Sequence, residues 1–130
     1  MRFIELEDLG DERGSVHSLP AAALDALSKV RNVHLTTLKP GYVRGNHVHS
    51  RQREVILITG PGSWEFYYVE EPGGPSEVTA FSGTVTVAVE VPPGIPHAIK
   101  NTGSSEIAVL SCTDLAYDPA APDVAEHLLA

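Results

Sequence analysis

The sequence predicts an all-β protein, a barrel or sandwich formed as a single domain over residues 1–130. Three observations indicate this class. Short segments with strand-like patterns recur along the chain, turns rich in Gly and Pro separate them, and only two segments have a helical composition. A chain of 130 residues is long enough to bury one substantial core without disulfides.

Nine segments carry the strand pattern, in which successive side chains alternate between two faces. They are residues 3–6, 14–18, 33–38, 55–59, 64–69, 78–81, 84–91, 98–101 and 107–113. Segment 84–91 is the clearest, because its valines all share one face. In segment 64–69, Trp64, Phe66 and Tyr68 share a face that we expect to line the core.

Two segments predict short helices. Residues 20–30 begin with Pro20, which suits a first helical turn, are rich in Ala and Leu, and have Lys29 near the end, where a cation is favourable. Residues 122–130 offer Asp123 as an N-cap with Glu126 three residues later, which is the spacing of a capping box. Turns are predicted where Pro and Gly cluster, as at 39–41, 71–75 and 92–94.

The composition excludes several classes of partner. A formal net charge of -8 argues against binding nucleic acid or an anionic membrane, because both need a basic surface. No apolar run approaches the roughly 20 residues of a membrane-spanning helix, and the acidic N-terminus lacks the pattern of a signal peptide. We therefore expect a cytoplasmic protein. The lone Cys112 agrees with a reducing compartment and is expected to be a buried strand thiol.

Four residues form the candidate metal site. His47 and His49 are one residue apart, so on a strand they share a face with Cα atoms about 7 Å apart. Glu54 follows closely, and His97 comes far downstream, after a Pro-Gly turn. Three imidazole nitrogens and a carboxylate oxygen suit one divalent Zn, Ni, Fe, Mn or Co ion. In the alternative, no metal binds and the histidines do acid/base work.

Two stretches of the chain carry these residues at characteristic spacings. They are Gly41-x5-His47-x-His49-x4-Glu54-x5-Gly60 and Pro92-x-Gly94-x2-His97-x3-Asn101. Together they resemble the two motifs of the cupin superfamily, except that the glycine expected before the second motif falls on Thr86. The resemblance covers residues 33–113. It implies a double-stranded β-helix (jelly-roll) barrel with one or two short helices, a homodimer, and a metal near the barrel mouth on the four residues above.

A finer resemblance covers four short stretches of the sequence. They are GDERGSV, RGNHVH, PPGIPHAIKNTG and AYDPAAPDV. These are similar to cupins of bacterial polysaccharide biosynthesis, which include ketoisomerases and epimerases of nucleotide-activated sugars. They most resemble the C-terminal cupin domain of capsular polysaccharide enzymes, where it is fused to a dehydrogenase-like domain. That domain is missing from this sequence, so the resemblance implies at most the cupin's own step.

Epimerisation next to a ketone needs a base and a group that stabilises the enediolate oxygen. If a metal occupies the four ligands, the acid and base must come from elsewhere at the mouth. The catalytic candidates are Tyr42, Tyr67 and Tyr117, with Tyr68 and Glu65 as further possibilities. If no metal binds, His47 or His49 becomes the base. His17, His34 and His127 have no such partners, and His17 or His34 is a site candidate only if it points into the barrel.

Arginines near the motif indicate a small, polar or anionic substrate. Arg13 and Arg44 each lie beside a glycine that lets a ligand approach the backbone, and Arg53, with Arg51, lies between the histidines and Glu54. This favours a sugar-nucleotide substrate over a second hypothesis, an Fe(II) dioxygenase with an apolar pocket. A third hypothesis, a non-catalytic binding module for a sugar or small acid, stays open. Dimerisation would cover edge strands such as segment 3–6.

Overall fold

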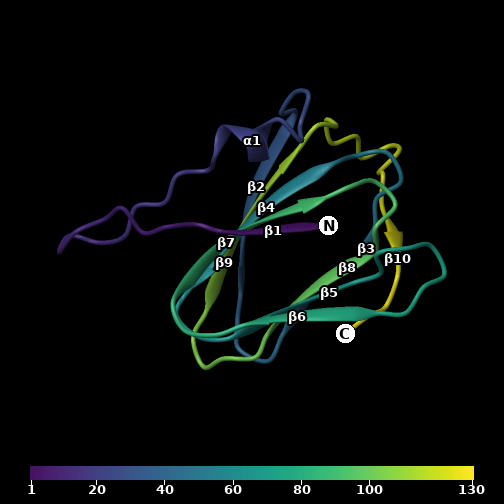
Figure 1. Ribbon diagram of the computed structural model, residues 1–130. Coiled ribbons are helices and arrows are strands. Elements are labelled where there is room, and N and C mark those ends of the chain that lie inside the picture. Colours follow the sequence, from purple (N-terminus) through teal and green to yellow (C-terminus); the bar gives the residue numbers. More distant parts are fainter.

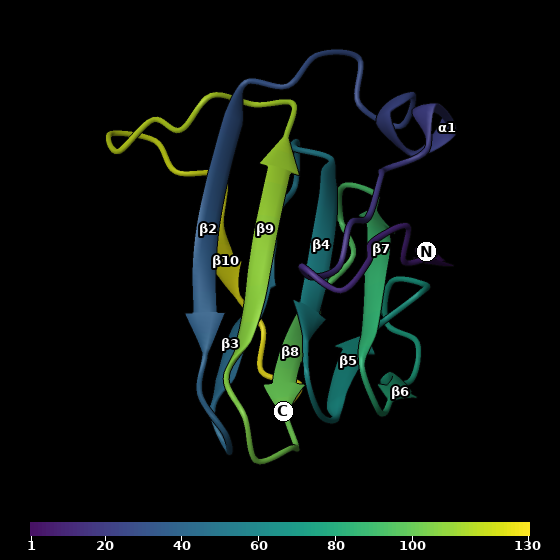
Figure 2. The same cartoon turned by 90° about the vertical axis from the view of Figure 1, so that its left-hand side faces the viewer.

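The computed structural model describes residues 1–130 as two antiparallel sheets packed face to face (Figures 1 and 2). One sheet has the order β1 (Arg2–Glu5), β7 (Val85–Val91), β4 (Glu54–Gly60), β9 (Ile107–Thr113), β2 (Asn32–Leu38). The other has the order β10 (Ala125–Glu126), β3 (Val43–Val48), β8 (His97–Asn101), β5 (Trp64–Tyr68), β6 (Glu77–Phe81). Except for β5 and β6, neighbouring strands are not consecutive along the chain, as in a jelly roll, so the predicted fold class is confirmed.

The core lies between the inner faces of the two sheets. The valines of β7 at positions 87, 89 and 91 belong to it, as do the alternating residues Trp64, Phe66 and Tyr68 of β5. Phe3 of β1 reaches across to Phe66 with an edge-to-face ring contact at 5.5 Å. The period-two faces predicted for both segments are confirmed.

Of the two predicted helices, the first forms only in part and the second is wrong. Only α1 (Ala21–Leu24) forms in the segment 20–30, and the chain leaves the helix at Asp25. Segment 122–130 is not helical. It runs extended and pairs through β10 with β3. Asp123 does accept backbone N–H groups, as its capping pattern predicted, but they belong to Arg51 and Gln52 in a distant loop. No helix in the structure is long and apolar enough to cross a membrane.

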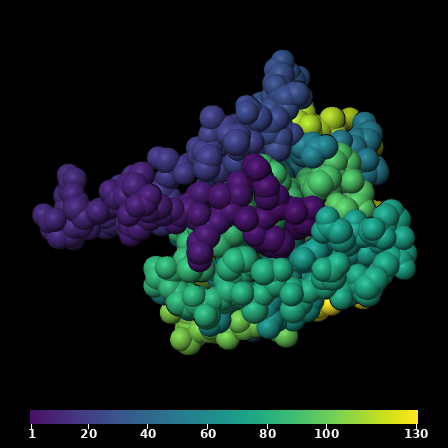
Figure 3. All heavy atoms as spheres, viewed as in Figure 1, coloured from purple at the N-terminus to yellow at the C-terminus, as the bar shows by residue number.

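Residues 7–19 project from the body of the protein as an arm (Figures 1 and 3). The predicted strand at 14–18 is wrong, because the segment joins no sheet. Its backbone pairs only within the arm, between Asp11 and Gly14 and between Leu9 and Val16. Cys112, expected to be buried, is only partly covered.

Candidate functional site

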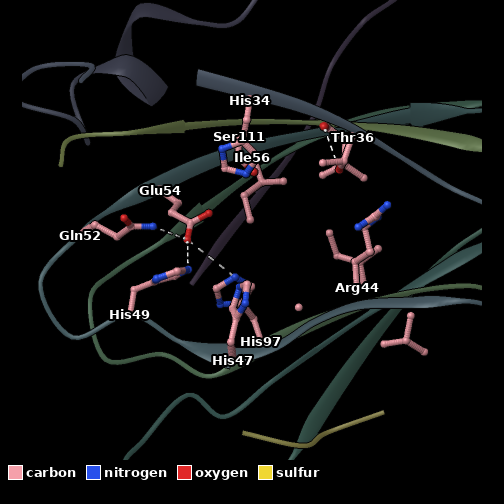
Figure 4. Close-up of a pocket in the computed structure, with 14 residues that line it drawn as sticks. His34, Thr36, Arg44, His47, His49, Gln52, Glu54, Ile56, His97 and Ser111 are labelled. Atoms are coloured by element: carbon pink, nitrogen blue, oxygen red, sulfur yellow. Dashed lines mark hydrogen bonds and ion pairs between the residues drawn. The ribbon is translucent and has the colours of Figure 1, made fainter. Parts of the chain in front are cut away.

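Four side chains from three strands and one loop converge at one end of the space between the sheets (Figure 4). His47 belongs to β3 and His97 begins β8, while Glu54 begins β4 and His49 lies just beyond the end of β3. One donor atom from each lies within 4.8 Å of the others. Nε2 of His49 is 2.8 Å from Oε1 of Glu54, and Nε2 of His97 is 4.0 Å from the same oxygen. The four residues singled out as ligands therefore do form one cluster.

A local irregularity in β3 brings the histidines together. The register with β8 shifts between Gly45 and His47, so that His47 lies opposite His97. Gly45 has φ +92°, and a Cβ there would lie 2.8 Å from the carbonyl oxygen of His97. Asn46 follows with φ +54°, a left-handed conformation that asparagine tolerates better than most residues. The regular strand pairing is thus interrupted by a bulge between β3 and β8, just before the two histidines that were expected to share a strand face.

The pKa shifts of the clustered side chains favour the protonation states in which nitrogen and carboxylate oxygen can act as metal ligands. Burial, reinforced by His97 and His49, lowers the pKa of His47 to about 4, and burial also lowers the pKa of His97. Burial acts the same way on His49, but the hydrogen bond and charge of Glu54 outweigh it and raise the pKa of His49. Burial would raise the pKa of Glu54, yet His49 and His97 lower it to about 2. At neutral pH the carboxylate is ionised and two imidazoles are neutral, which suits metal ligation.

Hydrogen bonds outside the cluster orient its members. Nδ1 of His97 lies 3.0 Å from the carbonyl oxygen of Ile95, and Nδ1 of His49 donates to the carbonyl oxygen of Asp123. A carbonyl oxygen only accepts, so Nδ1 carries the proton in both rings and Nε2 faces the cluster. Gln52 donates its side-chain amide to Oε1 of Glu54 at 3.0 Å. This outer shell is typical of a metal centre.

A cavity of about 410 Å³ opens over the cluster. Besides the four residues above, its polar lining consists of His34, Thr36, Arg44, Gln52 and Ser111. The Nε–H group of Arg44 donates a hydrogen bond to the carbonyl oxygen of Thr37, with an N–O distance of 2.9 Å. The guanidinium group forms no ion pair. The cavity therefore combines a cluster of metal-ligand type with an unneutralised positive charge.

The other predicted arginines lie away from this cavity. Arg13 is near the tip of the arm, where it pairs with Asp11 at 2.7 Å. Arg53 is not among the lining residues, and its backbone N–H donates to Asp114 at 2.9 Å. Arg51 points toward Asp123, with a separation of 3.6 Å. Of the predicted substrate-binding residues, only Arg44 lines the cavity over the cluster.

None of the predicted catalytic tyrosines lines this cavity. Tyr67 donates its hydroxyl to Glu65, and this hydrogen bond raises the pKa of Tyr67. Tyr42 is mostly exposed and lines a separate hollow with Arg44. Tyr117 is also exposed and lines a neighbouring hollow, which shares His34, His49 and Gln52 with the cavity. Tyr68 packs in the core.

Sequence reasoning gave little weight to His34, which lines the cavity from β2. The period of that strand could have indicated this position, since His34, Thr36 and the core residue Leu38 share one face. Nδ2 of Asn32 lies 3.4 Å from Nδ1 of His34. His34 thus meets the condition under which it was a site candidate, and His17, which lies outside this cavity, does not.

The sequence of the chain matches one known protein family. A family model described as the polysaccharide biosynthesis C-terminal domain matches residues 10–125. A search of the curated proteins finds no matching sequence.

Comparison with solved structures finds similar folds in bacterial proteins. The capsular polysaccharide assembling protein CapF from Staphylococcus aureus is 25% identical, with a TM-score of 0.67 over 95% of this chain and 34% of that chain. A dTDP sugar isomerase from Desulfovibrio desulfuricans is 16% identical, with a TM-score of 0.76 over 98% of this chain and 83% of that chain. The sugar 3,4-ketoisomerase QdtA from Thermoanaerobacterium thermosaccharolyticum, solved with TDP, is 18% identical. Its TM-score is 0.66 over 95% of this chain and 85% of that chain. This chain spans about a third of the CapF chain.

Proposed function

Because the chain belongs to the polysaccharide biosynthesis C-terminal domain family, we propose that it is a metal-binding isomerase or epimerase of a nucleotide-activated keto sugar. One observation carries this proposal: the cavity holds a four-donor cluster and an arginine that has no acidic partner. The similarity to CapF, to a dTDP sugar isomerase and to a TDP-binding 3,4-ketoisomerase supports the class of substrate.

In this proposal His47, His49, Glu54 and His97 hold one divalent transition metal ion. The donor set is appropriate, because three imidazole nitrogens and one carboxylate oxygen suit such ions and leave positions open. When bound, the ion supplies a Lewis acid that stabilises negative charge on the carbonyl oxygen of a substrate. The four ligands are then unable to act as free bases.

Proton transfer is therefore assigned to His34. It is the histidine of the cavity lining that lies outside the four-residue cluster. Imidazole can accept and return a proton near neutral pH. His34 removes the proton from the carbon beside the ketone, and the electron pair moves onto the carbonyl oxygen. Return of a proton to the same carbon from the other face, with the electron pair moving back from the oxygen, gives the epimer. Return of the proton to the former carbonyl carbon gives the isomeric ketone, because the hydroxyl on the neighbouring carbon then passes its proton to the enediolate oxygen and becomes the new carbonyl.

Arg44 binds the anionic part of the substrate in the same scheme. Its Nε is held by the carbonyl oxygen of Thr37, so the guanidinium is fixed in place while its other N–H groups stay available. A guanidinium binds a diphosphate with charge-assisted, paired hydrogen bonds. The polar lining also argues against the apolar pocket of a dioxygenase.

Metal binding is tested by elemental analysis of the freshly purified protein. We expect about one stoichiometric ion in the wild type and loss of that ion in His47→Ala and in His97→Ala, since each removes one ligand. His17→Ala is the matched control, because His17 lies on the arm. A wild-type protein that neither carries nor takes up a metal would contradict this part of the proposal and favour the histidines as acid and base.

Catalysis is tested by following exchange of the substrate's carbon-bound hydrogen with D2O by mass spectrometry. TDP-4-keto-6-deoxyglucose and its UDP counterpart are suitable probes. We expect deuterium uptake beside the ketone with the wild type and a rate about 100- to 10,000-fold lower with His34→Asn, because a positioned acid or base contributes that much. His17→Asn should exchange at the wild-type rate.

The outcomes separate the remaining hypotheses. Exchange by His34→Asn at the wild-type rate would exclude His34 as the base. Thermal stabilisation by the nucleotide sugars without any exchange would indicate a binding module. Stabilisation by small carboxylic acids alone would contradict a sugar-nucleotide substrate.

A further inference from the structure

The C-terminal segment lies against β3 and the loop that follows it, which carry the proposed metal ligands His47 and His49. Figure 1 shows β10 running beside β3, and the paired residues are Ala125 with Val48 and Glu126 with His47. Beyond β10, Asn46 accepts the backbone N–H groups of Leu129 and Ala130 at 2.9 and 3.0 Å. The last residues of the chain are therefore tied to the bulge that sets the position of His47.

Asp123, just before β10, makes the densest set of contacts with this loop. Its Oδ1 accepts the backbone N–H of Ser50 at 3.2 Å and the Ser50 hydroxyl at 2.7 Å. Its Oδ2 accepts the backbone N–H groups of Arg51 and Gln52, each at 2.9 Å. The side chain is 5% exposed. Burial would raise the pKa of the Asp123 carboxyl, but these hydrogen bonds lower it, so the group is ionised at neutral pH.

These contacts lead to two of the proposed ligands by separate routes. The backbone carbonyl of Asp123 accepts Nδ1–H of His49 directly, which turns Nε2 of that ring toward the cluster. The carboxylate holds the backbone of Gln52, whose side-chain amide donates to Glu54. One residue of the C-terminal segment thus sets both the ring orientation of His49 and the partner of Glu54.

From this geometry we infer that Asp123 is a positioning residue of the metal centre, and that the C-terminal segment completes the site by holding loop 49–52 in its ligating conformation. The inference rests on the proposed metal site. It assigns a role to a residue 74 positions away from the histidine that it orients. Outer partners of metal ligands commonly change metal affinity by about 10- to 100-fold.

The test compares Asp123→Ala and Asp123→Asn with the wild type and with Asp118→Ala. Asp118 is a matched control, because it lies in the same C-terminal stretch and caps only the nearby Ala120 N–H. Zn2+ affinity is measured by chelator competition, and the site geometry by the electronic absorption spectrum of the Co2+-loaded protein. Circular dichroism and thermal unfolding in the absence of metal establish that each variant is folded.

We expect Asp123→Ala to bind Zn2+ about 10- to 100-fold more weakly and to show an altered Co2+ spectrum. Asp123→Asn keeps a single acceptor oxygen and places an NH2 group against backbone donors, so we expect a smaller loss in the same direction. Asp118→Ala should match the wild type in both measurements. A merely structural role would lower stability without changing the Co2+ spectrum of the folded protein.

Failure of the inference is distinguishable from failure of the metal site itself. A wild-type protein that binds neither ion would overturn both. A wild type that binds Zn2+, with unchanged affinity and spectrum in Asp123→Ala, would overturn the positioning role alone. If Asp123→Ala does not fold, the same two measurements on Asp123→Asn test the inference. A Zn2+ affinity and a Co2+ spectrum equal to those of the wild type in that variant would overturn it.

Discussion

At the scale of single residues, Gly45 determines how closely β3 approaches His97. Its φ of +92° favours glycine, and any Cβ at this position would lie only 2.8 Å from the carbonyl oxygen of His97. The approach is what places His47 opposite His97 across the two strands. The geometry of the proposed metal centre therefore depends on a residue that supplies no ligand.

Gly45→Ala should lower the stability of the fold and weaken metal binding. The left-handed backbone costs about 1–2 kcal/mol for a residue with a Cβ, and the contact with β8 adds to that cost. Gly41→Ala is the control, because Gly41 has φ +81° but nothing within 4 Å of its Cβ position. Urea unfolding and Zn2+ titration of both variants measure the difference. Equal losses in the two variants would contradict a role for the close approach.

At the scale of elements, β5 shows how a strand divides between core and surface. Phe66 is fully buried in the core, whereas Tyr67 faces away from it with its hydroxyl on Glu65. The alternation of the sequence predicted this division, because a strand has a period of two. The same local reasoning failed for segment 122–130, where pairing with β3 and the contacts of Asp123 outweigh the helical pattern.

Phe66→Ala should destabilise the protein by about 3–5 kcal/mol, because it removes a large buried ring and leaves a cavity. Tyr67→Ala, on the same strand and the opposite face, should cost clearly less. Urea unfolding of the metal-free proteins measures both. Similar losses for the two variants would contradict the assignment of the core face.

At the scale of the whole molecule, the outer face of the sheet β1-β7-β4-β9-β2 carries an exposed apolar row beside the open edge of β2. Figure 2 shows this face toward the viewer, with β2 at its edge. Leu35 is 68% exposed and lies in register with Leu110 of β9, which is opposite Leu57 of β4. An open strand edge can pair with another chain, and a two-fold axis would bring the same apolar row of two copies together. We expect a homodimer through this face.

Leu35→Glu should shift the protein from dimer to monomer, because it places a charge at the exposed end of that apolar row, on the edge strand β2. Val78→Glu is the control, since Val78 is 50% exposed on β6, the edge strand of the other sheet. Sedimentation velocity at micromolar concentration measures the change. A wild type that sediments as a strict monomer would contradict the prediction, as would dimerisation unaffected by Leu35→Glu.

The sequence alone was sufficient for the all-β class, for the inward faces of β5 and β7 and for the identity of the four clustered residues. The fold class and the inward faces follow from local periodicity, which is a property of the chain before it folds. The grouping of the four residues follows from the two motif spacings and from the family resemblance that they carry. The positions of Arg44, His34 and Asp123 around that cluster depended on the three-dimensional structure. Strands far apart in sequence pair at the cavity, and the physical reason is that burial and hydrogen bonding between them outweigh local preference. Asp123 illustrates this, because its carboxylate caps backbone N–H groups 72 and 71 residues away instead of those of its own segment.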